Sequence, residues 1–330
     1  MDADIYRRWS VERFWMGGIQ GDNLQEIRSD LEAIDEPGFW SIAGTFEGSW
    51  TLARFKDVSR KEFVSEGKDL KVSPWGSSKS QDEYKSYVEE IRSLIADGEV
   101  YQVNACRILS SKILEEGNLS GLFSRILSQN PAPFAGYLSL PDLEIASASP
   151  ERFISKDGNR IISSPIKGTS ATNEFLAKDR AENLMIVDLI RNDLGRICET
   201  GSIGTPRLLA TEEHPGLFHL VSDVSGSLKK EFALSEAIAE VMPPGSISGA
   251  PKSSALRIIR SNEGERGPYC GVFGWSDGNR MELSVGIRLF WRSKDEIKFG
   301  TGAGITWDSD PESEWEETEL KARRLISLTQ

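Results

Sequence analysis

Cysteine and histidine are scarce in this sequence. The three cysteines, Cys106, Cys198 and Cys270, lie far apart in a chain of 330 residues. An odd, widely spaced set predicts neither a disulfide framework nor a zinc site built on cysteine pairs. The two histidines, His214 and His219, are too few for most histidine-rich metal sites.

A positive net charge and long apolar runs are absent as well. The formal net charge is −12, whereas proteins that bind nucleic acid or an anionic membrane need a basic surface. The N-terminus has no apolar signal-peptide core, and no apolar run is long enough for a membrane-spanning helix. We expect a cytoplasmic protein whose partner is neither nucleic acid nor a membrane. A small anionic substrate remains compatible with the acidic balance, because local cations can dominate a cleft.

Many strand-like runs and a few long helices make up the chain. Runs such as FAGYLSL, RMELSVGIRLFWR and EIKFGTGAGITW are typical of strands, and Gly, Pro and Asp turns separate them. Ser80 and Glu83 form a capping box at the start of one helix, while Asp310 and Pro311 begin another. Because the strands and helices do not alternate regularly, the pattern predicts an α+β fold with antiparallel sheets.

A lysine in a tight Pro/Gly frame stands at the centre of the sequence. Pro165 restricts the approach to Lys167, and Gly168 gives the backbone freedom just after it. A lysine amine attacks carbon only when it is uncharged, a state that burial or nearby positive charge favours. Lys167 is therefore either a structural or substrate-binding cation or a nucleophile.

Two predicted helices carry carboxylates that suit a cation. The helix after Lys178 is expected to end near Gly195 and, with apolar residues on nearly every side, to be buried. Its acids must be paired or metal-bound. They are Glu182, Asp188 and Asp193, with Arg180, Arg191 and Arg196 as candidate salt-bridge partners. On the C-terminal helix, Glu314 and Glu317 either join Glu182 in binding Mg²⁺ or, as Glu317 can with Lys321, pair with cations.

Several positions suit an anionic substrate. The loop Gly245–Lys252 lacks the spacing of a P-loop, but its backbone N–H groups precede a helix and suit a carboxylate. The GTGAG run at Gly300–Gly304 is either a second anion-binding nest or a tight turn. Arg288, on a strand of small and apolar residues, either captures a carboxylate or faces solvent. His219 is either a hydrogen-bonded core residue or a catalyst, and Glu151 taken alone is a turn carboxylate.

Together these segments resemble the chorismate-utilising enzymes, the family of anthranilate synthase component I, aminodeoxychorismate synthase component I, and the isochorismate and salicylate synthases. The matching motifs occur in the family's order: SPERF, PIKGT, KDRAENLMIVDLIRNDLGR, HLVS, PGSISGAPK, CGVFGW, GIR and GAGITWDSDPESEWEET. The resemblance covers residues 80–328, the implied chorismate-binding catalytic domain, and residues 1–75 would add strands. The implied fold is a sandwich of two large, mostly antiparallel β-sheets flanked by helices, with the active site in the cleft between them.

The resemblance also implies a role for each matching residue. Glu182 and Glu317 match glutamates that bind Mg²⁺, with Glu314 nearby. Glu151 matches a general acid/base, and His219 matches a histidine that contacts the substrate ring. Substrate contacts are implied for Arg288, Ser248, Gly249, Gly302, Ala303, Gly304 and Gln102.

Two positions distinguish between activities within the family. Isochorismate- and salicylate-forming members carry a lysine base where this chain has Gln102, so activation of water is disfavoured. Anthranilate synthases carry alanine where Lys167 stands in PIKGT, the pattern of aminodeoxychorismate synthase component I. The resemblance thus implies conversion of chorismate and ammonia to 4-amino-4-deoxychorismate, a p-aminobenzoate and folate precursor, through a covalent Lys167 adduct. A separate glutamine amidotransferase subunit would supply the ammonia. The alternatives are anthranilate synthase component I and 2-amino-2-deoxyisochorismate synthase.

Overall fold

A computed structural model describes residues 11–170, 174–214 and 217–330 of the chain. The first ten residues of the predicted N-terminal segment lie outside these ranges. The helices are η1 (Leu31–Asp35), α1 (Gln81–Ala96), α2 (Ser120–Gln129), α3 (Ala177–Ile197), α4 (Leu234–Val241), η2 (Gly245–Ile247), α5 (Lys252–Asn262) and α6 (Pro311–Ser327).

The strands account for most of the remaining chain. They are β1 (Arg13–Met16), β2 (Ile19–Arg28), β3 (Phe39–Gly44), β4 (Trp50–Arg60), β5 (Lys71–Val72), β6 (Gly76–Ser77), β7 (Gln102–Glu115), β8 (Phe134–Ser139), β9 (Glu144–Ser149), β10 (Arg152–Asp157), β11 (Arg160–Ser164), β12 (Ile166–Ser170), β13 (Gly204–His214), β14 (Leu217–Ser227), β15 (Gly249–Ala250), β16 (Val272–Ser276), β17 (Arg280–Val285), β18 (Leu289–Ser293) and β19 (Glu296–Ile305).

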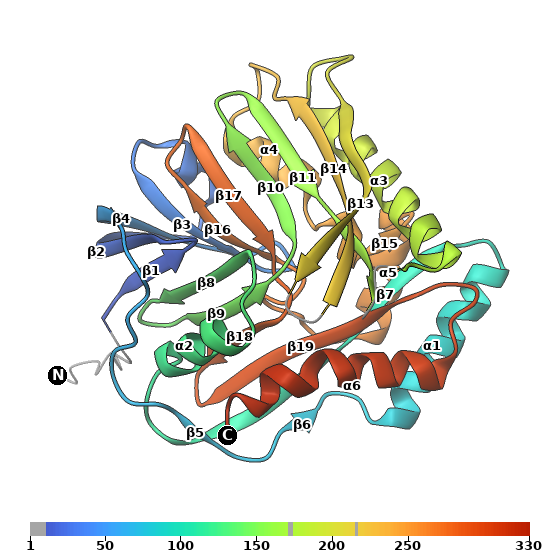
Figure 1. Ribbon diagram of the computed structural model, residues 1–330, viewed down its shortest axis with the longest axis horizontal. Helices are drawn as coiled ribbons and strands as arrows, with labels where there is room; N and C mark the ends of the chain where they lie inside the picture. Colours follow the sequence, from blue (N-terminus) through green and yellow to red (C-terminus); the bar gives the residue numbers. More distant parts are fainter. Residues whose placement is uncertain (1–10, 171–173, 215–216) are drawn as a thin grey trace.

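The strands form two antiparallel layers that are joined at one hairpin. One layer runs β13-β14-β11-β10-β17-β16-β3-β4-β2, with β12 also paired to β14. The other runs β1-β8-β9-β18-β19-β7, and the short β5, β6 and β15 pair with β7. Pairing of β1 with β2 links the layers into one hydrogen-bonded network. Figure 1 shows the layers, with α6 and α2 on the outside of one and α3 beside the other. The predicted α+β sandwich is confirmed.

The predicted first turns of two helices are present in the structure. The Ser80 hydroxyl accepts a hydrogen bond from the Glu83 N–H, and the Glu83 carboxylate accepts one from the Ser80 N–H, as in the predicted capping box. Asp310 likewise caps α6, whose first residue is Pro311. Such caps satisfy N–H groups that have no partner inside the helix, and each contributes about 1 kcal/mol.

Helix α3 differs from its prediction in two ways. It continues through Gly195 to Ile197 and ends where Cys198 adopts an extended conformation, because a glycine in an open position weakens a helix without stopping it. It also buries one face only: Ile186 and Ile190 are buried, whereas Leu184 is 45% exposed. The helix lies against β12 and β14 from outside (Figure 1), so its outer apolar residues misled the expectation of complete burial.

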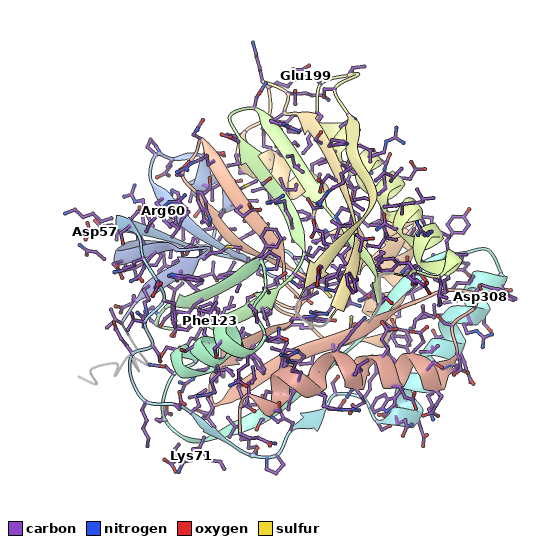
Figure 2. The ribbon with its side chains drawn as sticks, in the orientation of Figure 1. Asp57, Arg60, Lys71, Phe123, Glu199 and Asp308 are labelled. Atoms are coloured by element: carbon purple, nitrogen blue, oxygen red, sulfur yellow. The ribbon has the colours of Figure 1, made fainter. Side chains whose placement is uncertain are left out.

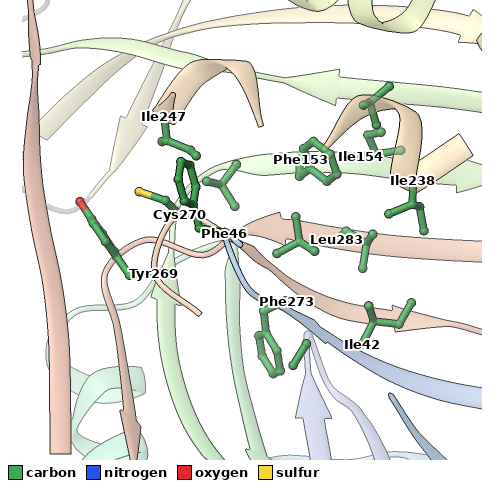
Figure 3. Close-up of a cluster of buried hydrophobic side chains, with 14 of the residues drawn as sticks. Ile42, Phe46, Phe153, Ile154, Ile238, Ile247, Tyr269, Cys270, Phe273 and Leu283 are labelled. Atoms are coloured by element: carbon green, nitrogen blue, oxygen red, sulfur yellow. The ribbon is translucent and has the colours of Figure 1, made fainter. Parts of the chain in front are cut away.

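The core fills the space between the layers and their covering helices. In Figure 3, Ile42 of β3, Phe273 of β16 and Leu283 of β17 lie on neighbouring strands, with Ile238 of α4 facing them. On the other layer, Phe123 of α2 packs against the sheet. Charged residues such as Glu199, which follows α3, lie at the edge of the molecule (Figure 2). Each fully buried aromatic side chain contributes roughly 1.5–3 kcal/mol of burial free energy. None of the helices in the described ranges offers the apolar length that a bilayer crossing needs.

Candidate active site

Lys167 lies in a bulge of β12 that turns its side chain toward β19. The pairing of β12 with β14 shifts register between Ile166 and Thr169, and Gly168 within the bulge has φ +89°. Bulges redirect side chains, and a left-handed φ favours glycine. A Cβ atom placed on Gly304 would lie 3.7 Å from Lys167 Nζ and 2.4 Å from Gln102 Nε2. The side-chain ends of Lys167 and Gln102 therefore both lie close to Gly304.

The strand that carries Gly304 presents backbone groups to this place that do not bond to β7. Gly302 and Gly304 oppose Cys106 and Asn104 in the β19–β7 ladder. The N–H groups of Cys106 and Asn104 donate elsewhere, to Glu263 Oε1 and to the Ser248 carbonyl, at 3.0 Å each. Opposed residues in an antiparallel ladder bond to each other mutually or not at all. The backbone N–H and C=O groups of Gly302 and Gly304 therefore point away from β7.

None of the described strands covers the edge to which they point at this end of β19. Pairing with β18 stops at Phe299, and Lys321 Nζ reaches the Gly302 carbonyl from α6 at 3.0 Å. The backbone groups of the intervening Ala303 point to the opposite edge of the strand, so its amide faces β7. The GTGAG run is thus an extended strand with a free edge. Both local expectations, a nest and a tight turn, were wrong, because pairing with β7 keeps the glycines extended.

The loop before α5 packs against the start of β7. Ser248 is fully buried, and its hydroxyl donates to the Pro244 carbonyl at 3.0 Å. Gly249 has φ +142°, and a Cβ atom there would lie 2.2 Å from the Gln102 carbonyl oxygen. Only glycine allows this approach, which places the loop beside Gln102.

Glu151 is a buried acid near Lys167. It lies between β9 and β10 and is 4% exposed. Burial raises its pKa to about 7, although hydrogen bonds from the Ser246 hydroxyl and the Ile166 N–H, and the charge of Lys167, favour the carboxylate. An acid with such a pKa is partly protonated at neutral pH and can donate or accept a proton there.

Arg288 carries a half-buried positive charge. The predicted strand SVGIRLF breaks between Val285 and Leu289. It breaks because Gly286 packs closely on another segment: a Cβ atom there would lie 2.2 Å from the Pro268 carbonyl oxygen. Arg288 then adopts φ +51°, and burial alone lowers the pKa of its guanidinium. No carboxylate within the described ranges forms an ion pair with it. Such a cation suits an anionic ligand.

His219 lies deep in β14, with 2% of its surface exposed. It opposes Thr169 of β12 on one side and Glu212 of β13 on the other. Its strand therefore adjoins the one that carries Lys167.

Glu182 of α3 and Glu314 of α6 both lie within electrostatic reach of Glu317 of α6. Burial raises the pKa of Glu182, with a smaller contribution from Glu317 and opposition from Lys167 and Lys178. Burial and Glu317 also raise the pKa of Glu314. Burial would raise the pKa of Glu317 too, but the Lys321 ammonium, 2.5 Å away, outweighs it and holds this pKa below its ordinary value.

These carboxylates fit a magnesium ion that retains several waters. The described part of the chain contains no preformed group of three or more close metal ligands. Mg²⁺, however, takes only one or two carboxylates from a protein and keeps its remaining waters. Glu314 Oε2 is buried and has no hydrogen-bond partner among the described residues, and a buried carboxylate oxygen in that state calls for a cation or a donor. The residues present therefore suit Mg²⁺.

The other acids of α3 are explained by ion pairs. Asp188 pairs with Arg191 at 3.1 Å, as the local alternative predicted. Asp193 pairs instead with Lys252 at 2.6 Å, and Arg196 pairs with Glu240. The nearest cation to Glu182 is Lys178, at 3.8 Å. The structure thus brings together Gln102, Glu151, Lys167, Glu182, Gly304, Glu314 and Glu317. Sequence reasoning missed Ser246 beside Glu151 and the contact of Lys321 with β19, for which the local pattern held no signal.

Comparison with known proteins identifies the family of the chain. Residues 47–327 match the family described as chorismate binding enzyme. The chain is 36% identical over 270 residues to aminodeoxychorismate synthase component 1 of Salmonella typhimurium, covering 77% of this chain and 59% of that protein. It is 34% identical over 273 residues to anthranilate synthase component 1 of Saccharolobus solfataricus, covering 78% and 64%. The chain thus spans less than two thirds of the length of these relatives.

Solved structures show the same fold. Anthranilate synthase component I of Streptococcus pneumoniae superposes with a TM-score of 0.79 at 22% identity, covering 100% of this chain and 94% of that one. The menaquinone-specific isochorismate synthase of Escherichia coli superposes with a TM-score of 0.81 at 18% identity, covering 100% and 92%. With the family match over most of its length, the chain belongs to the chorismate-binding enzymes.

Proposed function

We propose that this protein is an aminodeoxychorismate synthase component I, which converts chorismate and ammonia to 4-amino-4-deoxychorismate. The observation that carries the proposal is the position of Lys167, aimed by a bulge at Gly304 and flanked by Gln102. A similarity of 34–36% to both kinds of component 1 fits either an aminodeoxychorismate or an anthranilate synthase. The proposal therefore chooses between them on Lys167.

Chorismate carries two carboxylates, and the site offers two places for them. Arg288 and the free N–H groups of Gly302 and Gly304 suit the enolpyruvyl carboxylate. Glu182, Glu314 and Glu317 would hold Mg²⁺ opposite the ring carboxylate. The bound ion would supply positive charge that stabilises the ring carboxylate and the departing hydroxyl. The loop at Ser248–Gly249 closes the site beside the ring, and His219 lies on the strand next to that of Lys167.

The chemistry follows from the positions of Lys167 and Glu151. The uncharged Lys167 amine forms a bond to C2 of the ring, the ring double bonds shift, and the C4–oxygen bond breaks. Glu151 donates its proton to the departing hydroxyl, which leaves as water. Ammonia then forms a bond to C4 while the bond between C2 and Lys167 breaks, and the carboxylate of Glu151 accepts the surplus proton. The enolpyruvyl group remains on the product. Delivery of ammonia by a separate amidotransferase component belongs to this proposal.

Product identification tests the function directly. The purified chain is incubated with chorismate, Mg²⁺ and ammonium, and the products are separated by chromatography with mass detection. We expect 4-amino-4-deoxychorismate. Anthranilate or 2-amino-2-deoxyisochorismate would overturn the proposal in favour of its alternatives.

The raised pKa of Glu151 predicts how the rate depends on pH. Its pKa of about 7 lies above the ordinary glutamate value, so the proton-donating form is present below pH 7 and is lost as the pH rises through it. We expect kcat to fall above about pH 7. Glu151→Gln should lower kcat by roughly 10²–10⁴-fold, since the amide cannot transfer a proton, and should remove this fall in kcat above about pH 7. Steady-state rates between pH 5.5 and 9 measure both effects.

Glu144 provides a matched control for this prediction. It is another buried glutamate whose pKa burial raises to about 7. Its carboxylate accepts hydrogen bonds from the Leu119 N–H and the Tyr137 hydroxyl, beside α2. Glu144→Gln should leave the shape of the kcat profile unchanged. A wild-type profile in Glu151→Gln would show that Glu151 transfers no proton.

A further inference from the structure

The turn between β19 and α6 holds one oxygen of Glu314 in place. Ser309 is 2% exposed, and its hydroxyl donates to Glu314 Oε1 at 2.6 Å. The same hydroxyl oxygen accepts the Thr306 N–H at 3.0 Å, and the Ser309 N–H donates to the Thr306 carbonyl at 3.2 Å. The neighbouring Asp308 lies at the edge of the molecule beside the start of α6 (Figure 2).

The donors around Ser309 determine the direction of its hydroxyl proton. The Thr306 N–H can only donate, so it occupies a lone pair of the serine oxygen, and the hydroxyl proton is left for Glu314. A carboxylate that receives such a bond has a restricted orientation. With Oε1 engaged, Glu314 Oε2 is the oxygen that stays buried without a partner among the described residues.

We propose that Ser309 is a positioning residue that holds Glu314 with Oε2 directed at the cation. The inference rests on the Mg²⁺ site of the proposed function and adds how one carboxylate of that site is oriented. It implies that Oε2 of Glu314 is the oxygen presented to the cation, directly or through a cation-bound water, while Oε1 stays bonded to Ser309. Removing a residue that orients a metal-binding carboxylate commonly lowers the affinity for the metal about tenfold or more.

Ser309 is not needed to begin helix α6. Asp310 already caps the helix: its carboxylate accepts the Ser313 N–H at 2.9 Å and the Ser313 hydroxyl at 2.8 Å. The Asp310 carbonyl accepts the Glu314 N–H at 2.9 Å. Because the cap is complete without it, the hydroxyl of Ser309 serves the carboxylate of Glu314.

Binding of Mn²⁺, a paramagnetic substitute for Mg²⁺, tests the proposal without reference to turnover. The full chain is titrated with Mn²⁺ in the presence of chorismate, without ammonium, and free Mn²⁺ is measured by electron paramagnetic resonance. We expect Ser309→Ala to weaken Mn²⁺ about tenfold or more and Ser309→Thr, which keeps the hydroxyl, to restore most of the affinity. Ser327→Ala, which removes an exposed hydroxyl at the far end of α6, should bind as the wild type does.

The outcomes separate this inference from the proposed function. Wild-type affinity in a folded Ser309→Ala overturns the positioning role. Glu314→Gln serves if Ser309→Ala does not fold: it keeps an acceptor for Ser309 but replaces the free oxygen, and wild-type Mn²⁺ affinity in it would show that this oxygen does not face the cation. A wild-type chain that binds no Mn²⁺ would overturn the Mg²⁺ site itself. A chain that binds Mn²⁺ but forms another product would overturn the proposed activity and leave the role of Ser309 standing.

Discussion

Replacing Lys167 by alanine should reduce the formation of 4-amino-4-deoxychorismate by about 10³-fold or more, as expected for the loss of a covalent nucleophile. Any remaining turnover should shift toward anthranilate or 2-amino-2-deoxyisochorismate, since ammonia can then attack C2 in place of the lysine. Quantifying all three products under saturating chorismate and ammonium measures both effects. The affinity for chorismate should change much less than the rate, because the carboxylate contacts remain.

A second measurement distinguishes a nucleophile from a substrate-binding cation. When ammonium is withheld, the wild-type chain should accumulate a covalent adduct visible in its intact mass, and Lys167→Ala should not. Lys156 of β10, whose ammonium donates to the carbonyls of Gly278 and Asn279 at 2.8 and 3.1 Å, provides the control. Lys156→Ala should keep both the product and the adduct. An unchanged rate and product in Lys167→Ala would remove the basis on which the function was assigned.

Arg288→Met should weaken binding of chorismate strongly while leaving the protein about as stable as the wild type. The Arg288 guanidinium is only partly buried, so its removal should change the free energy of unfolding by about 1 kcal/mol or less. Loss of a charge-assisted hydrogen bond, worth roughly 1.5–3 kcal/mol, should raise KM for chorismate about 10- to 100-fold. Methionine retains the Cβ atom at φ +51°, so the backbone strain is the same in both proteins. Thermal unfolding and steady-state kinetics measure the two changes.

Arg280 is the matched control for Arg288. It begins β17, is half exposed, and pairs with Asp277 at 3.0 Å. Arg280→Met should change neither KM nor stability by much, since exposed ion pairs contribute little. Arg288→Lys tests geometry, because lysine keeps the charge but not the planar donors that bind a carboxylate in two places. A normal KM in Arg288→Met would show that the arginine does not bind substrate.

Local chemistry in the sequence predicted some elements well. The capping box at Ser80 and the Asp310–Pro311 start of α6 depend on groups within a few residues of each other, and the structure has both. Strand signals separated by turns led correctly to antiparallel sheets. Gly195 was misread as a helix end, because a glycine stops a helix only where the backbone turns away, and here the turn comes at Cys198.

The sequence by itself determined the class of fold, the family and the candidate residues, since these depend on ordered motifs and short-range patterns. Only the tertiary structure decided which groups are free to act. The amides of Gly302 and Gly304 are available because β7 bonds to the loop before α5 and to Glu263 at the opposing positions. Arg288 lies at the break between β17 and β18, next to the close contact of Gly286 with Pro268, and forms no ion pair with any described carboxylate. Each of these depends on segments distant in sequence, and their register and packing cannot be read from local patterns.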